Sequence, residues 1–299
     1  AGNAVTTGVN NTIVGGLAGD ALTTGVNNTA IGLGALGTED TGGQNVAVGV
    51  NALATLNFNG NGLNTAVGYA AGAAITTGVQ NTIVGGEAGD AITTGSRNIL
   101  MGISAGGATT VGSLNVAIGN SALAANILTD RNVAIGVDAL NALVGDGSTA
   151  NQATYNTAVG YLAGLSVTSG TYTTLVGGLA GDALTTGDYN VALGYNALST
   201  EDTGNKNVAI GSDVLKNLNY NGDGFNTAVG HNAGYAMTTG INNTIVGALA
   251  GDALTTGTKN VAIGTQSLST ENTGSRNVAI GYQALLQLDF NGEGYNVAI

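Results

Sequence analysis

A short pattern of polar and apolar residues recurs along the whole chain. It reads Asn-(Thr/Val)-(Ala/Ile)-(Val/Ile)-Gly, with few variants. Its first residue falls at positions 11, 28, 45, 64, 81, 98, 115, 132, 156, 173, 190, 207, 226, 243, 260, 277 and 296. The spacing is 17 residues in twelve cases, 19 in three and 24 in one. A fixed period of this kind indicates a repeat fold.

The length of the repeat predicts the fold class. A helical-hairpin repeat needs roughly 33 residues or more, so 17 residues suit one turn of an all-β, parallel β-solenoid or β-roll. Counting Asn as coil position 1, we expect one strand in the pentapeptide, which is rich in β-branched residues. We expect a second strand from coil position 8 to about position 12, before a Thr-Thr-Gly turn such as Thr23–Gly25.

The Asn column predicts a structural role. Stacked coils place equivalent residues above one another, so the Asn side chains can form an amide ladder; Asn in a solvent-facing turn is the alternative. The predicted structural residues are Asn11, Asn28, Asn45, Asn64, Asn115, Asn207 and Asn277, with Gly15, Gly119 and Gly281 closing their pentapeptides.

Coil positions 9 and 12 compensate for each other. Position 9 is Gly in eight coils and Leu in eight, and seven of the Gly coils carry an apolar residue at position 12. Four Leu coils instead carry Glu39, Asn126, Glu201 or Glu271 there. The four longer coils have Leu at both positions. This pattern predicts a core packed at nearly constant density along the stack.

Alternation along the strand predicts that the coils associate. Position 4 is always Val, Ile, Leu or Met, which favours the coil interior. Position 3 is always Ala, Ile or Leu, although a solvated outer face would be polar. We therefore expect position 3, including Ala117, Ala134 and Ala209, to pack against copies of the chain in a closed homo-oligomer, a homotrimer above all. A wide single coil whose far wall covers the strand is the alternative.

These motifs resemble a known repeat. NVAIG at 115–119, 132–136, 207–211, 260–264 and 277–281, and NTAVG at 64–68, 156–160 and 226–230, are similar to the YadA-like head repeats of trimeric autotransporter adhesins. Similar arrays occur in bacteriophage tail fibres. The resemblance implies a trimer of β-rolls outside the cell, on a cell surface or a virion. The 17-residue period is longer than the adhesin repeat, and neither coiled-coil heptads nor a membrane anchor is visible.

The array spans residues 1–299 as one continuous domain, interpreted as a window of a longer chain. Its higher-order blocks are 11–63, 64–155, 156–225 and 226–295. The last two blocks align without gaps and are identical at 41 of 70 positions.

The amino-acid composition excludes some fold classes and disfavours some classes of binding partner. The chain has 52 Gly, no Pro, Cys or Trp, and a net charge of −12. Without Pro it is no collagen, and without Cys it has no disulfide or thiolate metal site. The acidic balance disfavours nucleic acid and anionic membrane surfaces as partners. The six basic residues look scattered.

The chain offers little chemistry. His231 is the single histidine, and no coil carries a distinct catalytic cluster, so we expect no enzyme activity, no cofactor and no histidine metal site. Short acidic turns occur at Glu39-Asp40 and Glu201-Asp202. The Asp/Asn-rich turns of the long coils leave weak Ca²⁺ binding open.

A ligand, if there is one, is expected at the long coils. Phe58, Tyr220 and Phe290 each lie beside an Asn-Gly turn, and an aromatic ring next to polar groups suits a sugar face. The alternative is that these rings plug the wider layers. Insertions in a solenoid map to loops on one face, where function usually lies.

We therefore expect a structural or adhesive extracellular fibre segment, whose partners are copies of itself and a host-surface glycan or matrix. A tail-fibre shaft is the alternative. An ice-binding solenoid is less favoured, because adjacent Thr side chains of the Thr-Thr-Gly turn point to different faces. A polysaccharide-cleaving β-helix is weaker still.

Overall fold

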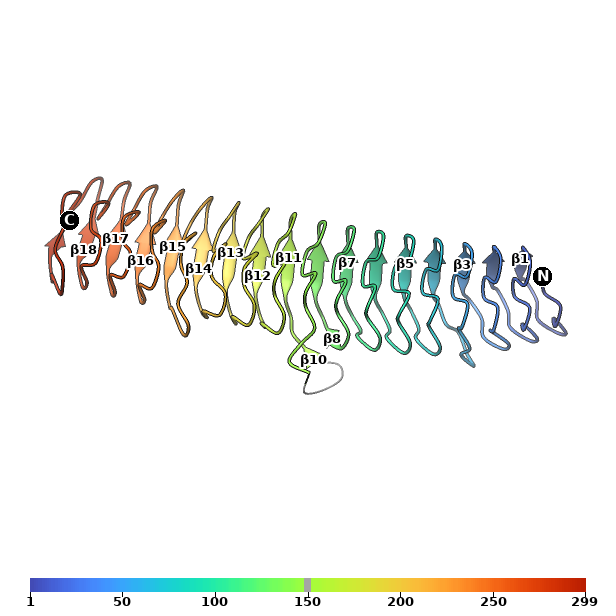
Figure 1. Ribbon diagram of the computed structural model, residues 1–299. Helices are drawn as coiled ribbons and strands as arrows, with labels where there is room; N and C mark the ends of the chain where they lie inside the picture. Colours follow the sequence, from blue (N-terminus) through green and yellow to red (C-terminus); the bar gives the residue numbers. More distant parts are fainter. Residues whose placement is uncertain (148–151) are drawn as a thin grey trace. The chain divides into compact units, whose positions relative to one another are not determined.

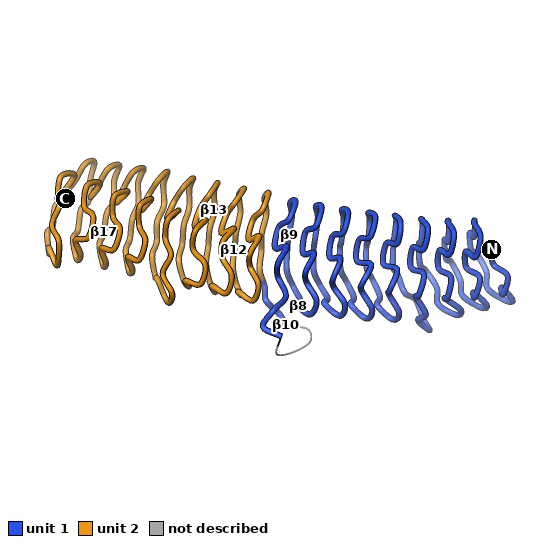
Figure 2. Tube along the Cα trace, viewed as in Figure 1, with its two compact units in different colours: residues 1–155 blue, residues 156–299 orange. Residues whose placement is uncertain are grey.

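The chain is a parallel β-solenoid of about 17 turns. The computed structural model describes residues 1–147 and 152–299, and these residues form strands but no helix (Figure 1). They fall into two compact units, Ala1–Tyr155 and Asn156–Ile299 (Figure 2). Each unit is a stack of coils, and each coil contributes its pentapeptide strand.

The strands are short. The first unit contains β1 (Thr12–Val14), β2 (Thr29–Ile31), β3 (Val46–Val48), β4 (Thr65–Val67), β5 (Thr82–Val84), β6 (Ile99–Met101), β7 (Val116–Ile118), β8 (Thr129–Asp130), β9 (Val133–Ile135) and β10 (Gln152–Ala153). The second contains β11 (Thr157–Val159), β12 (Thr174–Val176), β13 (Val191–Leu193), β14 (Val208–Ile210), β15 (Thr227–Val229), β16 (Thr244–Val246), β17 (Val261–Ile263), β18 (Val278–Ile280) and β19 (Val297–Ala298).

Neighbouring pentapeptides pair in parallel and in register, so equivalent coil positions lie above one another. Thr12 pairs with Thr29, for example, and Ala47 with Ala66 across a 19-residue coil. The extra residues of the long coils are therefore absorbed outside the strand, and the register continues unchanged. A separate parallel pair joins β8 and β10.

The prediction of a second strand in each coil is wrong. Coil positions 8 to 12 form turns, because positions 7 and 9 adopt left-handed backbone conformations, as at Leu17 (φ 57°) and Gly19 (φ 49°). Residues that alternate between right- and left-handed conformations cannot stay extended. These turns still stack, since the Gly19 amide donates to the Ala35 carbonyl 2.9 Å away in the next coil.

The expected direction of the strand side chains is also wrong. Coil position 3 points into the coil: Ala47 and Ala117 are 0% exposed, and so is the larger Ile83. Position 4 points outward, with Val14 at 56% exposed and Met101 at 39%. The interior is too narrow for a second column of β-branched residues in every coil, so the smaller side chain takes the inner place.

Positions 3 and 9 meet inside the coil and share its volume. A Cβ on Gly89 would approach Leu100 Cδ1 to 2.7 Å, so glycine at position 9 leaves room for a large residue at position 3 of the next coil. Within each coil, Leu at position 9 always accompanies Ala at position 3, as in Ala30 with Leu36. Large position-3 residues occur only with Gly at position 9.

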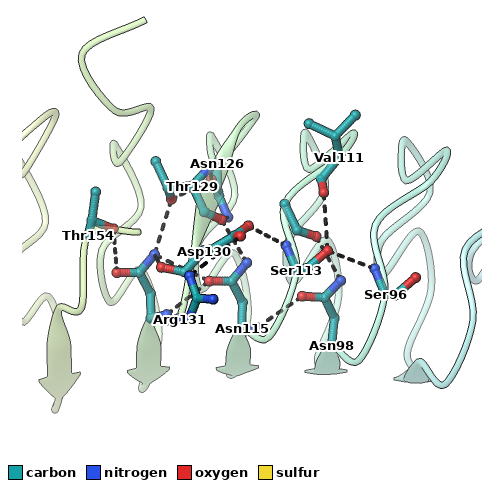
Figure 3. Close-up of polar contacts among 12 residues, drawn as sticks. Ser96, Asn98, Val111, Ser113, Asn115, Asn126, Thr129, Asp130, Arg131 and Thr154 are labelled. Carbon is teal, nitrogen blue, oxygen red and sulfur yellow. Dashed lines mark hydrogen bonds and ion pairs between the residues drawn. The ribbon is translucent and has the colours of Figure 1, made fainter. Parts of the chain in front are cut away.

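The Asn side chains form the amide ladder and also close the coils. The backbone amide of Asn115 donates to Asn98 Oδ1 at 3.0 Å, and the side-chain Nδ2 of Asn115 donates to the Thr129 carbonyl at 2.8 Å (Figure 3). The first bond joins two coils, and the second joins the beginning of a coil to its end. At the one exception, Thr173 Oγ1 lies 2.9 Å from Asn156 Oδ1 and donates to it.

The closing glycine of the pentapeptide has both a conformational and a steric reason. Gly15 has φ 126°, which side chains rarely tolerate. A Cβ there would also lie 2.6 Å from the Gly32 carbonyl oxygen of the next coil.

We expect adjacent substitutions on β7 to have opposite effects. Ala117→Asp buries an unpaired carboxylate in the coil, which costs about 3–5 kcal/mol, so the variant should lose its β-sheet circular dichroism or its cooperative unfolding. Ile118→Asp points outward and should keep both. Equal behaviour of the two variants would contradict the side-chain directions described above.

We also expect the ladder to be sensitive to a single break. Asn81→Ala leaves the Gly95 carbonyl and the Asn98 amide without their buried partner, a loss of about 2–4 kcal/mol. Chemical denaturation measures it, with Gln80→Ala, an exposed neighbour, as the matched control. If both variants unfold at the same denaturant concentration, the ladder contributes little.

Candidate functional site

The most continuous feature of the surface is the outer side of the sheet. We call the outward side chains at coil positions 2 and 4 the strand face. Position 2 is Thr, Val or Ile and position 4 is Val, Ile, Leu or Met, so none of the described strands places a charge on this face. Ile99, Ile210 and Ile263 are 41%, 38% and 37% exposed. An outer sheet face in contact with water normally carries polar residues.

The size of the strand face is that of an interaction surface. At ~4.8 Å between strands, eight paired strands extend over about 34 Å, and two outward columns give each unit a strip of roughly 300 Å². Position 2 is Thr in eight of the seventeen pentapeptides, so the strip is mixed in character. Its area is at the lower end of the roughly 300–600 Å² of the largest apolar patch on a typical monomer, a patch that is often functional.

Exposed tyrosines border the strand face at coil position 6. Tyr69, Tyr161, Tyr195 and Tyr282 are 59%, 60%, 55% and 72% exposed. His231 is the equivalent residue of its own coil and is also exposed. Tyrosine at the border of an apolar patch is typical of protein interfaces, because its ring packs while its hydroxyl stays hydrated.

A second outward column precedes each Asn. The structure places five of the six basic residues in it, although only Lys259 and Arg276 are in adjacent coils, so they share one coil position without forming a patch: Arg97, Arg131, Lys206, Lys259 and Arg276. All adopt positive φ, and a repeat of 17 or 19 residues brings this position above itself. The signal was present in the sequence, since each basic residue directly precedes the Asn of the next coil.

This second column is largely neutralised by its own neighbours. Lys206 Nζ lies 2.6 Å from Asp223 Oδ2 and 5.1 Å from the centroid of the Phe225 ring. The rings of Tyr172 and Tyr189 stack with their centroids 5.0 Å apart. The aromatic and basic residues therefore stabilise the stack from outside, by cation–π and stacking contacts.

The aromatic residues expected to bind a ligand lie on the loops of the long coils. Phe58 and Tyr220 are half-buried, and Phe290 is 49% exposed. The Phe58 ring lies against its own Asn-Gly turn, where a Cβ on Gly60 would come within 3.0 Å of Cε1. Leu53 and Leu56, both 0% exposed, fill the interior of that coil. Ligand binding at these loops stays a prediction.

Three carboxylates at coil position 12 lie inside the coils. Glu39, Glu201 and Glu271 are 0% exposed. Burial raises the pKa of Glu39 and of Glu201 above the ordinary value for Glu, against the opposing effect of backbone amides that donate to each carboxylate.

Residues 1–147 and 152–299 contain no group of three or more His, Cys, Asp or Glu side chains arranged to hold a metal, and no pocket. Within the same ranges no helix has the length and apolar character needed to cross a membrane. The surface of the described coils is therefore best analysed as faces and loops.

Comparison with family models, with curated proteins and with solved structures gave no match. The structure defines the class of the protein as a parallel β-solenoid. The resemblance to adhesin head repeats stays an expectation that depends on the pentapeptide motif.

We expect Phe58→Ser to cost less stability than Leu56→Ala in the same coil. The ring already contacts solvent, whereas removing a buried Leu side chain costs about 2–5 kcal/mol. Thermal unfolding of the two variants, each compared with the unmodified chain, gives the answer. A larger loss for Phe58→Ser would show that the ring is a structural plug.

Proposed function

We propose that this chain is a structural segment of an extracellular fibre, which assembles with copies of itself through the strand face and has an adhesive role. The observation that carries the proposal is the uncharged, apolar strand face repeated on the described coils. An adhesin-like head and the shaft of a phage fibre are both consistent with it.

A second copy of the chain is the partner that fits this face best. The chain has a net charge of −12, and the strand face is a surface on which two copies can meet without opposing carboxylates. Its side chains repeat at the strand spacing of ~4.8 Å, so the ridges of one copy match the grooves of another along the axis.

A closed assembly is the arrangement that fits a single strand face per chain. One strand face per chain, packed around a common axis, buries the apolar strip and leaves no free copy of it for further growth. Three chains are the expected number because the pentapeptide resembles that of trimeric adhesin heads. The same resemblance supports the extracellular location, on a cell surface or a virion.

The surface-attachment part of the proposal is supported by the loops of the long coils. They display Phe58, Tyr220 and Phe290 beside Asn, Asp and Glu side chains outside the regular stack. A glycan or an extracellular matrix component is the class of ligand that such loops suit, since rings cover sugar faces and polar groups bind hydroxyls.

The interface proposed here differs from the position-3 surface expected from the sequence. Ala117, Ala134 and Ala209 are each 0% exposed inside their coils, so no partner chain can reach them. Substituting them with Asp is a test of folding, and the assembly must be tested with outward residues.

We expect the triple variant Ile210→Lys, Val229→Lys, Ile263→Lys to dissociate the assembly while each chain stays folded. Three charges in the interface would be buried without partners, whereas in the free chain they are solvated. Sedimentation velocity gives the mass of the assembly, and circular dichroism reports the fold.

The matched control is Thr186→Lys, Thr239→Lys, Thr256→Lys, which adds the same charge at exposed turn positions of the same unit. It should sediment like the unmodified chain. If the unmodified chain sediments as a monomer, the proposed assembly is wrong. If the strand-face variant stays trimeric, the interface lies elsewhere.

A further inference from the structure

Every long coil is preceded by a coil with a buried polar residue at position 12. These residues are Glu39, Asn126, Glu201 and Glu271, each 0% exposed, and they precede coils of 19, 24, 19 and 19 residues. In most other coils the same place holds an apolar side chain such as Leu22, also 0% exposed. The substitution of a carboxylate for a leucine in a core needs a reason, because burying a charge is costly.

The reason lies in the backbone amides of the following turn. In a regular coil the amides of Thr23, Thr24 and Gly25 donate to one carbonyl of the next coil, that of Asp40, at 2.7, 3.2 and 3.3 Å. The loop of a long coil does not offer that carbonyl to the coil before it. The Gly42 amide donates instead to Glu39 Oε1 at 2.7 Å.

The second carboxylate oxygen reaches into the long coil. Glu39 Oε2 accepts from the Phe58 amide at 3.2 Å, and Glu201 Oε2 accepts from the Tyr220 amide at 3.3 Å. The same pair of bonds recurs at Glu271, with the amides of Gly274 and Phe290. Each glutamate therefore joins two coils at the first residue of an aromatic loop.

Packing holds the carboxylate in this place. A Cβ on Gly42 would lie 2.6 Å from Glu39 Cδ, and one on Gly204 would lie 2.5 Å from Glu201 Cδ. Only glycine at this turn lets the carboxylate lie beneath it. Glycine at this coil position is a requirement of regular coils as well, since a Cβ on Gly25 would overlap the Gly42 carbonyl oxygen, and the buried carboxylate uses the same space.

The two bonds depend on the charge of the carboxylate. An ionised carboxylate accepts at both oxygens, whereas a protonated one turns an oxygen into a donor. The protonated oxygen is then a much weaker acceptor, so one of the two amides loses most of its bond. The shorter bond, to Gly42 or Gly204, is the stronger, so the bond to the amide of Phe58 or Tyr220 is the one lost.

We propose that Glu39 and Glu201 are acid-sensitive clamps: ionised, they hold the Phe58 and Tyr220 loops on the preceding coil, and protonated, they release these loops while the coils stay folded. The proposal concerns single chains and does not depend on self-association. Its consequence is that acidification changes how the aromatic loops are presented.

The surroundings of both carboxylates raise the pKa above the ordinary value for Glu. Burial is the largest effect and raises the pKa of both groups, and the charged neighbours that act on them, Asp40 and Asp202, raise it further. The amides of Gly42 and Phe58, and of Gly204 and Tyr220, oppose the shift without cancelling it.

The direction of the pKa shift of Glu39 and Glu201 distinguishes release of the loops from unfolding of the chain. Because the folded-state pKa lies above the unfolded value, the folded chain binds more protons between the two. The contribution of these groups to stability is therefore fully present below the unfolded pKa and falls as pH rises through the folded pKa. Protonation of Glu39 and Glu201 leaves the coils folded, and its effect is local.

Asn126 is the neutral equivalent within the same chain. Its Oδ1 accepts from the Thr129 backbone amide at 2.9 Å (Figure 3), in the same way as Glu39 Oε1 accepts from the Gly42 amide. Its amide group does not titrate in this range, so the turn at Thr129 is an internal reference without the clamp.

The test is hydrogen exchange of the full chain at about pH 7.5 and about pH 4, with each rate corrected for the intrinsic pH dependence of exchange. Peptides that contain Phe58 or Tyr220 should lose protection by about 10-fold or more in acid. The strands and the Thr129 turn should keep theirs. Unchanged loop protection, or simultaneous loss in the strands, overturns the proposal.

A variant assigns the effect to one carboxylate. Glu201→Gln keeps the size of the side chain but removes the charge, so the Tyr220 loop should be poorly protected at both pH values while the Phe58 loop still responds to pH. Glu87→Gln, an exposed carboxylate, is the control and should leave both loops as they are. A Glu201→Gln chain whose Tyr220 loop still responds to pH overturns the clamp. If that variant does not fold, the pH series on the unmodified chain decides by itself.

Discussion

The buried Asn ladder is the constraint on which the rest of the structure depends. Most side-chain oxygens of the ladder accept the backbone amide of the Asn in the next coil, and most side-chain nitrogens close their own coil through a carbonyl near its end. A short coil has many backbone groups that cannot reach water, and every one needs a partner. The ladder satisfies part of this demand at the same place in each layer, so it fixes both the register between coils and the circumference of each coil.

The narrow interior that results decides which side chains point inward. A column of Ala, with Ile or Leu where the opposite wall is glycine, fits beside the turn residues at positions 8 and 9. The larger Val and Ile of position 4 are therefore left on the outside, where they form the strand face. The same packing limit that makes the coil stable thus creates its most apolar surface.

The long coils show how the stack tolerates an irregular layer. The strand and the ladder continue through them, and the extra residues leave as loops. The amide at coil position 15 that loses its usual carbonyl donates instead to a buried side chain of its own coil, a Glu in three cases and an Asn in one. Local stability and a response to pH therefore arise from the same hydrogen bonds.

The sequence by itself determined the repeat, the solenoid, the Asn column and the loops of the long coils, because a strict period predicts stacking regardless of detail. It did not determine the direction of the strand side chains, since positions 3 and 4 are both apolar and alternation alone cannot say which side is inside. The covariation of Ala30 with Leu36, repeated in every Leu coil, held that information.

Only the tertiary structure decided the conformation of the second wall and the burial of the glutamates. Positive φ at positions 7 and 9 replaces the expected second strand with turns, and this conformation depends on how each coil packs on the next. Glu39 reads as a surface residue in sequence because charge is normally solvated; it is buried because two amides of neighbouring coils have no other acceptor. Residues 17 apart, such as Lys259 and Arg276, become neighbours only once the chain has coiled, because the parallel in-register pairing of β17 and β18 places their coils next to each other.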